Sequence, residues 1–242
     1  MDIFCAGMYR SCSTWQYNIC AELVERKAGG ERLGFIGGPM YEPFGSPSQS
    51  TWRVLKTHDG HDLFSAALRQ GRARAVYARR DIRDVVFSLM HKWSLSFDEI
   101  VAPNGLLEAC FAADRFWPSL PHVLCQSYER ITADPSTAVR AIAEHLSIRI
   151  ADAEADELSF EFSVTKNKER ARALAADLLA GGVDLANRKN HLRYDPQSLL
   201  HWNHLRDCSQ GGWKNLASPG QKNTLAELCG SWLVEHGYEP DM

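Results

Sequence analysis

The chain has 242 residues, of which 45% are hydrophobic and 24% are charged, and its formal net charge at pH 7 is -3. These values are typical of an ordinary α/β domain, so we expect a single domain over residues 1–242. They exclude a bulk attraction to nucleic acid or to a membrane surface, and the longest apolar runs are far shorter than the roughly 20 residues that cross a bilayer.

Four apolar segments of strand length predict β-strands. They are Asp2 to Ala6, Trp52 to Lys56, Arg74 to Ala78 and His122 to Gln126, and segments with helical periodicity lie between them. This alternation predicts an α/β fold of three layers, in which helices cover both faces of a mostly parallel sheet. Gly34 to Ser50 is rich in Gly, Pro and Ser, and we expect it to form a long loop between the first helix and the second strand.

Several polar residues mark the ends of helices. Asp134, followed by a proline, predicts a helix start, and Ser218 with Gln221 three residues later forms the pattern of a capping box. Gly237 is placed to end the last helix. The segment Glu161 to Asn190 is highly charged but rich in Ala and Leu, which predicts an exposed helix that could act as a mobile cover.

The chain has seven cysteines, an odd number, and no pair of them has the C-x-x-C spacing. Most lie inside apolar segments, so reduced, buried thiols in a cytoplasmic protein explain them best. The first apolar stretch begins at Ile3 with no basic segment before it, which argues against a secretory signal. His, Cys, Asp and Glu do not cluster at the spacing of metal ligands, so we expect no metal.

Residues 7–15, Gly-Met-Tyr-Arg-Ser-Cys-Ser-Thr-Trp, lie between a predicted strand and a predicted helix. Backbone N–H groups and the helix dipole converge on an anion in that setting, so the loop is a candidate phosphate site. It differs from the common ATPase loop, which would need Gly at Cys12 and Lys at Ser13, and its positive charge lies earlier, at Arg10. Small hydroxylic residues would also suit an ordinary helix N-cap.

The segment Arg80 to Ser88 follows the third predicted strand and opens another helix. Arg80 then lies at the carboxyl edge of the sheet, where ligands bind in open α/β folds, and Ser88 lies two turns into the helix. The alternative is a solvated helix start, in which Asp81 and Asp84 interact favourably with the helix dipole.

Taken in order, five short motifs resemble those of the cytosolic-type sulfotransferases that use 3′-phosphoadenosine 5′-phosphosulfate (PAPS). The motifs are residues 9–15, Lys56-Thr57-His58, residues 80–88, Tyr128-Glu129-Arg130 and Gly211-Gly212-Trp213-Lys214. The resemblance spans nearly the whole chain. It implies a P-loop-like nucleotide-binding fold, PAPS as co-substrate, 3′-phosphoadenosine 5′-phosphate (PAP) as product, and no metal.

The resemblance also implies which residues hold the nucleotide. They are Arg10, Ser11, Cys12, Ser13, Thr14, Trp15, Arg80, Ser88, Tyr128, Arg206, Gly211, Gly212 and Trp213. Arg10, with the backbone and hydroxyls that follow it, would hold the 5′-phosphosulfate. Arg80, Ser88 and Arg206 would bind the 3′-phosphate. Cys12 departs from the family, which usually has Gly there, so its backbone must avoid left-handed geometry or accept strain. Asp207-Cys208 also departs, because a Lys-Gly pair is common there.

Further roles implied by the resemblance concern the adenine and the chemistry. Trp15 and Tyr128 would line the adenine site, although Tyr128, like Trp213, could equally fill a core. His58 would be the general base, because a neutral imidazole can take the proton of an acceptor hydroxyl, and His61 is its rival. Lys56 would join Arg10 in offsetting charge on the bridging oxygen, if it points the same way as His58.

The acceptor is expected to be a small molecule with a hydroxyl or an amine, and neither its identity nor the oligomeric state follows from the sequence. Candidate walls of an apolar acceptor pocket are Trp93, Phe97, Trp117, His201, Trp202 and His204. Two alternatives stay open: an ATP-dependent small-molecule kinase on a degenerate P-loop, and a non-catalytic nucleotide-binding module.

Overall fold

The structure is a computed structural model, and it describes residues 1–43, 51–203, 205 and 210–239. Its centre is one sheet of parallel strands in the order β2-β3-β1-β4-β5. The strands are β1 (Asp2–Gly7), β2 (Glu31–Phe35), β3 (Arg53–Lys56), β4 (Ala73–Arg79) and β5 (Val123–Ser127). Helices cover both faces, so the expected three-layer α/β fold is confirmed.

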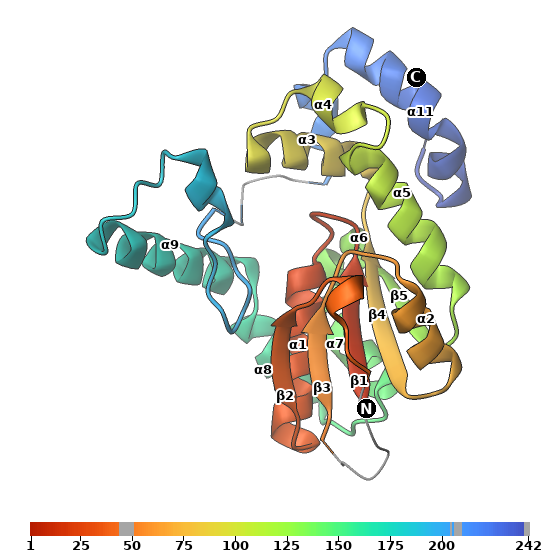
Figure 1. Cartoon of the computed structure of the whole chain (residues 1–242), viewed down its shortest axis with the longest axis vertical. Helices are drawn as coiled ribbons and strands as arrows, with labels where there is room; N and C mark the ends of the chain where they lie inside the picture. Colours follow the sequence, from red (N-terminus) through yellow and green to blue (C-terminus); the bar gives the residue numbers. More distant parts are fainter. Residues whose placement is uncertain (44–50, 204, 206–209, 240–242) are drawn as a thin grey trace.

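The helices before β5 are α1 (Ser13–Lys27), η1 (Gly38–Met40), α2 (Asp62–Arg69), α3 (Ile82–Trp93), α4 (Phe97–Val101), α5 (Leu106–Phe116) and η2 (Trp117–Ser119). Those after it are α6 (Tyr128–Ala133), α7 (Pro135–His145), α8 (Asp152–Glu161), α9 (Val164–Ala180), η3 (Arg188–Leu192), α10 (Trp213–Leu216) and α11 (Pro219–Glu235). In Figure 1 the strands run upward from the N-terminus, α3, α4 and α11 lie beyond their upper ends, and α9 projects to one side.

The central strands are buried on both faces, because successive side chains of a strand point to opposite sides. Ile3 and Cys5 of β1 pack with α1, α7 and α8, whereas Phe4 and Ala6 pack with α2, α3, α5 and α11. All four side chains are fully buried. Two apolar layers therefore hold the strand ends in register, and the carboxyl ends of β3, β1 and β4 meet at one edge.

Strand β2 corrects the sequence-based prediction of a loop from Gly34 to Ser50. Gly34 and Phe35 end β2, whose pairing with β3 shifts register between Arg32 and Gly34, and Gly34 has a φ of 78°. An edge strand of five residues with two charges and an irregular pairing carries no apolar run that would predict it. Residues 44–50 of the predicted loop lie outside the described residues.

The predicted helix ends are confirmed. Asp134 caps α7 by accepting a hydrogen bond from the backbone N–H of Thr137, and Ser218 and Gln221 form a capping box at α11. Gly237 follows α11 with a φ of 72°. The charged segment after Glu161 forms α9, in which Ala171 is the one buried side chain.

The loop after β1 lies very close to β4. A Cβ atom on Gly7 would lie 2.9 Å from the carbonyl oxygen of Ala78, from Ser11 Oγ and from Ser13 Cβ, so only glycine fits there. Ser11 is fully buried, and its hydroxyl lies 2.7 Å from the carbonyl oxygen of Met8 and 2.9 Å from that of Ala78. The Ser11 side chain therefore holds the loop on the sheet, and what it can offer a ligand is its backbone N–H.

Two residues of the same loop have left-handed backbones. The φ angles are 63° at Arg10 and 76° at Cys12, and Cys12 is the N-cap residue of α1. The sequence left open whether Cys12 avoids this geometry, and the structure shows that it adopts it. Alternation of left- and right-handed residues turns successive N–H groups toward one point, which is how backbone anion sites form.

We predict that Cys12→Gly is more stable than Cys12→Ala by about 1 kcal/mol in the free energy of unfolding, because both variants lose the thiol contacts but only glycine relieves the left-handed strain. Urea denaturation measures the difference. The control is Ala66→Gly in the right-handed helix α2. There the glycine should lower the free energy of unfolding by a similar amount. Equal stability of the two Cys12 variants would mean that the backbone at this residue is unstrained.

Candidate active site

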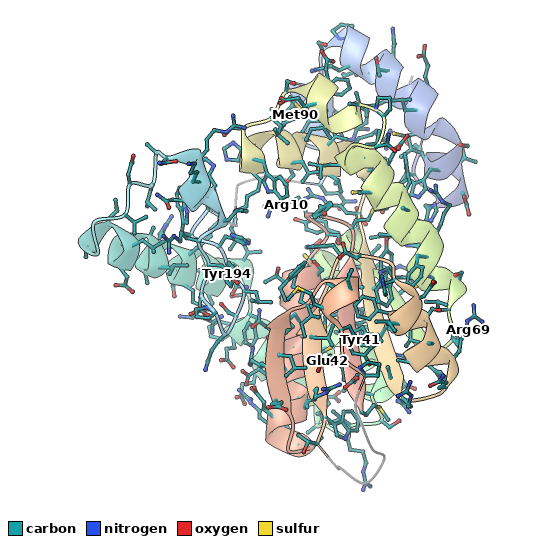
Figure 2. All side chains as sticks on the ribbon, viewed as in Figure 1. Arg10, Tyr41, Glu42, Arg69, Met90 and Tyr194 are labelled. Atoms are coloured by element: carbon teal, nitrogen blue, oxygen red, sulfur yellow. The ribbon has the colours of Figure 1, made fainter. Side chains whose placement is uncertain are left out.

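A cavity of about 410 Å³ opens at the carboxyl edge of the sheet. The loops after β1, β3 and β4 meet there, as the order of the strands requires. Predicted site residues that line it are Arg10, Ser11, Cys12, Ser13, Thr14, Trp15, Lys56, His58, Arg80, Ser88 and Tyr128. Figure 2 shows Arg10 between the upper ends of the strands and α3, with Tyr194 on the segment that follows α9.

The cavity wall is strongly cationic. Arg10, Lys56, Arg80 and Lys92 line it, and no Asp or Glu occurs among the described residues that do so. Lys56, Arg80 and Lys92 are each at least 95% buried. Burying several positive charges together without a carboxylate is costly unless an anion accompanies them.

Arg80 is the clearest example of a buried cation suited to an anion. Its guanidinium lies over the ring of Tyr128, 4.0 Å from the centroid, and Nη1 donates to the carbonyl oxygen of Arg10 at 3.3 Å. Nη2 lies 3.5 Å from Asp84 Oδ2, but Nε and Nη2 are buried and make no hydrogen bond to any described residue. A buried guanidinium with donors left over is suited to a phosphate, which accepts two of them at once.

The Gly211-Gly212-Trp213 segment lies behind Arg80, outside the cavity wall as described. Asp84 accepts hydrogen bonds from the backbone N–H groups of Gly211, at 2.9 Å, and of Trp213, at 3.1 Å. The Trp213 indole is buried in the core under the guanidinium of Arg83, 4.2 Å from the ring centroid. Among the described residues, Trp213 does not line the cavity and is connected to Arg80 through Asp84. Arg206, Asp207 and Cys208 lie outside the described residues.

Arg10 and Ser88 come together although 78 residues separate them. Arg10 Nε donates to Ser88 Oγ at 2.9 Å. Ser88 lies on α3, on the turn before Lys92. This bond places the Arg10 guanidinium between the loop and α3.

His58 is held by two hydrogen bonds. Its Nδ1 lies 2.8 Å from the carbonyl oxygen of Gly7, and its Nε2 lies 2.8 Å from Lys56 Nζ. The carbonyl can only accept, so Nδ1 carries the proton, and Nε2 accepts from Lys56 when that amine donates. The imidazole is thus fixed in the tautomer whose basic nitrogen faces Lys56.

Burial and cationic neighbours lower the pKa values of Lys56 and His58. Burial, with the positive charge of Arg10, lowers the pKa of Lys56 from 10.5 to about 7. Burial and the adjacent Lys56 lower the pKa of His58 well below 6.5. His58 is therefore a neutral imidazole at physiological pH.

The rival histidine has a different role. His61 Nδ1 accepts a hydrogen bond from the backbone N–H of Leu63 and so caps α2. A Cβ on Gly38 would lie 2.3 Å from His61 Cβ, which shows how closely η1 packs on this residue. His61 does not line the main cavity as described.

The predicted acceptor walls divide into two groups. Trp93 and His201 line the cavity, whereas Phe97 and Trp117 are buried in the core beneath it. Trp202 is half-buried and donates to the carbonyl oxygen of Asn190 at 2.9 Å. His204 lies outside the described residues. Phe35, which is 50% exposed, is an additional wall residue that the unpredicted strand β2 brings in.

Lys92 is a charged cavity residue that the motifs missed. It follows Ser88 by four residues on α3, which places both side chains on one helix face, and that spacing was the available signal. Burial and the positive charge of Arg10 lower the pKa of Lys92 to about 7. Burial, Lys92 and Lys56 lower the pKa of the facing His201 to about 3.

One side of the cavity is formed by residues 164–203, here named the cover segment, which contains α9 and η3. Leu192, Tyr194, Leu199, Leu200 and His201 of this segment line the cavity. Asn18 of α1 donates to the carbonyl oxygen of Ser198 at 2.9 Å, and Arg188 donates to the carbonyl oxygens of Trp93 and Ser94. The cover segment is thus attached to the core on both sides of the cavity.

The described part of the chain contains neither a metal-binding cluster nor a membrane-spanning helix. No three or more His, Cys, Asp or Glu side chains there lie close enough together to hold a metal ion. None of its helices combines the length and the apolar character that a membrane span requires.

Known proteins share both the sequence pattern and the fold. "Cytosolic sulfotransferase 1" of Arabidopsis thaliana is 23% identical over 275 residues, with 93% of this chain and 76% of that protein covered. A mouse sulfotransferase, SULT7A1, complexed with PAP superimposes with a TM-score of 0.65 at 19% identity, covering 96% of this chain and 83% of that one. A retinol dehydratase in complex with retinol and PAP also gives a TM-score of 0.65, at 16% identity, covering 96% and 81%.

A family model decides the family. The model described as the sulfotransferase domain matches residues 39–237, which is most of the chain and includes the Lys56-Thr57-His58, Arg80 to Ser88 and Tyr128 motifs. The loop with Arg10 precedes the matched span. The protein is therefore a member of the sulfotransferase family.

Proposed function

We propose that the protein moves the sulfuryl group of PAPS to a hydroxyl or amine of a small acceptor, with His58 as general base and PAP as product. The observation that carries the proposal is the buried guanidinium of Arg80, which has two donors that make no hydrogen bond to a described residue, in a cavity that His58 also lines. In this chemistry the S–O bond to the 5′-phosphate breaks while a bond from sulfur to the acceptor atom forms.

The nucleotide end of the cavity fits a nucleotide with a 3′-phosphate. Arg80 would give Nε and Nη2 to that phosphate, and Ser88 Oγ lies at the same end. Tyr128, already stacked on Arg80, and Trp15 would line the adenine. Arg206, which lies outside the described residues, is proposed as a second arginine for the 3′-phosphate on the ground of the family resemblance alone.

The transferring end would be held by the loop after β1. The left-handed residues Arg10 and Cys12 and the start of α1 supply backbone N–H groups, to which Ser13 and Thr14 add hydroxyls. Arg10 and Lys56 would offset negative charge on the leaving oxygen. Fixed cations are the main contribution a protein can make to such a transfer, because the transition state asks for positioning and charge stabilisation rather than covalent help.

His58 becomes a base only when Lys56 releases it. In the ligand-free protein Lys56 Nζ lies on Nε2 of His58, so an acceptor hydroxyl has no access to that nitrogen. We propose that the phosphosulfate draws Lys56 away as a charged ammonium, which leaves Nε2 to take the acceptor proton. The Nδ1–H bond to Gly7 keeps the tautomer fixed throughout.

The apolar rim of the cavity suits a small organic acceptor. Phe35, Leu192 and Tyr194 are 50%, 58% and 47% exposed and line the same cavity, and apolar residues gathered at one cavity are typical of a ligand-binding site. The proposal treats residues 1–242 as one catalytic domain, because the sheet and the cover segment line one cavity. Free cysteines such as Cys5 and Cys12 support a cytoplasmic enzyme.

The first prediction concerns nucleotide choice. Without added Mg²⁺, PAP should bind at least ~100-fold more tightly than AMP or ADP, since each charge-assisted contact to a phosphate contributes about 1.5–3 kcal/mol. Calorimetry on the wild type, on Arg80→Ala and on Arg69→Ala measures this; Arg69 is exposed at the end of α2, far from the cavity in Figure 2. Arg80→Ala should lose most of the discrimination and Arg69→Ala none. Equal wild-type affinities, or a requirement for Mg²⁺, would favour the kinase alternative.

The second prediction separates the two histidines. His58→Asn should lower kcat/KM by ~10²–10⁴ while the Kd of PAP changes little, because a general base acts in the transition state. The matched variant His61→Asn keeps a good N-cap on α2 and should stay within a few-fold of wild type. A rate loss in His61→Asn with none in His58→Asn would reverse the assignment.

The third prediction follows from the low pKa of Lys56. At pH 8 this lysine, with a pKa of about 7, is mostly neutral, and a bound anion raises its pKa, so PAP binding should take up as much as about one proton from the buffer. At pH 6 the lysine is already charged and contributes no uptake. Calorimetry in two buffers with different ionisation enthalpies reports the protons, and Lys56→Met should take up fewer at pH 8. Identical uptake in both proteins would show that the nucleotide does not act on Lys56.

A further inference from the structure

Lys92 lines the cavity, and none of the described residues that line it with Lys92 is an Asp or Glu. Only 4% of the surface of Lys92 is exposed. Nζ donates to the carbonyl oxygen of His191 at 3.2 Å and to the side-chain oxygen of Asn203. Both acceptors are neutral, and the charge that acts most on Lys92 is the positive charge of Arg10. An amine buried among neutral oxygens and a like charge is poorly compensated in the ligand-free protein.

Lys92 lies one turn beyond Ser88 on α3, where the aromatic wall of the cavity begins. The next residue, Trp93, contacts the Tyr9 ring with centroids 6.0 Å apart, and the Tyr9 ring lies 4.5 Å from His58. Phe35 completes this wall, 6.0 Å from His58. An aromatic surface therefore runs from the proposed base to the C-terminal end of α3, where Lys92 lies.

The groups opposite Lys92 come from the cover segment. His201 faces it, and the low pKa of that imidazole keeps it neutral. Leu192 and Leu200 add apolar surface on the same side. A molecule lying between His58 and Lys92 would thus meet a base at one end, apolar walls along its length and a single ammonium at the other end.

We propose that Lys92 binds an acidic group of the acceptor, so that the preferred acceptors are small aromatic or aliphatic molecules with a hydroxyl or amine at one end and an anionic group, such as a carboxylate, at the other. This inference rests on the proposed function. It goes beyond it by assigning a specificity residue and a substrate class. The acidic group would take Nζ of Lys92 as its ion-pair partner and supply the counter-charge that the cavity lacks.

The experiment compares two ligands that differ only in charge, para-hydroxyphenylacetate and para-hydroxyphenylacetamide. Their affinities for the PAP-loaded protein are measured by calorimetry, and their kcat/KM values with PAPS by turnover. The wild type should favour the acid by at least ~10-fold in both measurements, as a charge-assisted contact implies. Equal values for acid and amide would overturn the inference.

Two charge-neutralising variants then locate the contact. Lys92→Gln keeps a hydrogen-bond donor for His191 but removes the charge, and should abolish the preference for the acid. Lys189→Gln removes the same charge from an exposed residue of η3 near the cavity and should keep it. A preference that survives Lys92→Gln, or disappears equally in Lys189→Gln, would contradict the assignment.

The remaining outcomes separate this inference from the proposed function. If Lys92→Gln lowers kcat/KM equally for acid and amide and weakens PAP binding, Lys92 serves the transferring group or the nucleotide, and the acceptor assignment is wrong. If the wild type shows no preference for PAP over AMP, the proposed function fails at that earlier step. Tight PAP binding with equal affinities for acid and amide overturns the Lys92 inference alone.

Discussion

The cavity is shaped by one constraint, the burial of several positive charges in a wall whose described residues include no carboxylate. Arg80 and Lys92 are almost completely buried on the wall of the same cavity, and the cost of desolvating them is offset only in part by neutral oxygens, a tyrosine ring and the single carboxylate of Asp84. Such an arrangement persists in a folded protein because the rest of the fold over-determines it. Anionic ligands remove the imbalance, so binding and charge compensation are the same event.

Much of the surrounding structure holds these charges in place. Asp84 accepts two backbone N–H groups from the Gly211 to Trp213 segment, and Arg83 stacks on the Trp213 indole. Residues far along the chain thereby set the position of the first turn of α3, just after Arg80. The close approach of the loop after β1 to β4, which Gly7 permits, sets the position of Arg10. Arg10 is therefore held through its neighbours, whereas Arg80 also has the carboxylate of Asp84 beside it.

The pair of Lys56 and His58 shows how the same constraint prepares the chemistry. Burial and the cationic surroundings lower the pKa values of both groups, so the imidazole is neutral and the amine is close to its titration point near neutral pH. A lysine in that state responds to an incoming anion by gaining a proton, and a histidine whose other nitrogen is held by Gly7 can act only through Nε2. In the proposed reaction, Lys56 thus exchanges His58 for the phosphosulfate, and His58 exchanges Lys56 for the acceptor.

The sequence by itself determined the alternation of strands and helices, the caps at Asp134 and Ser218, and the three loops at the carboxyl edge, because these follow from periodicity and local hydrogen bonding. The sequence did not predict strand β2, because this irregular edge strand depends on its pairing with β3 rather than on a pattern in its own residues. The tertiary structure alone decided that Ser11 bonds to the sheet, that Trp213 lies in the core, and that Lys56 occupies the basic nitrogen of His58. It also brought Lys92 to the cavity wall. Most of these outcomes depend on contacts between residues tens of positions apart, such as Ser11 with Ala78 and His58 with Gly7. No local pattern encodes which of several possible partners a side chain finally meets.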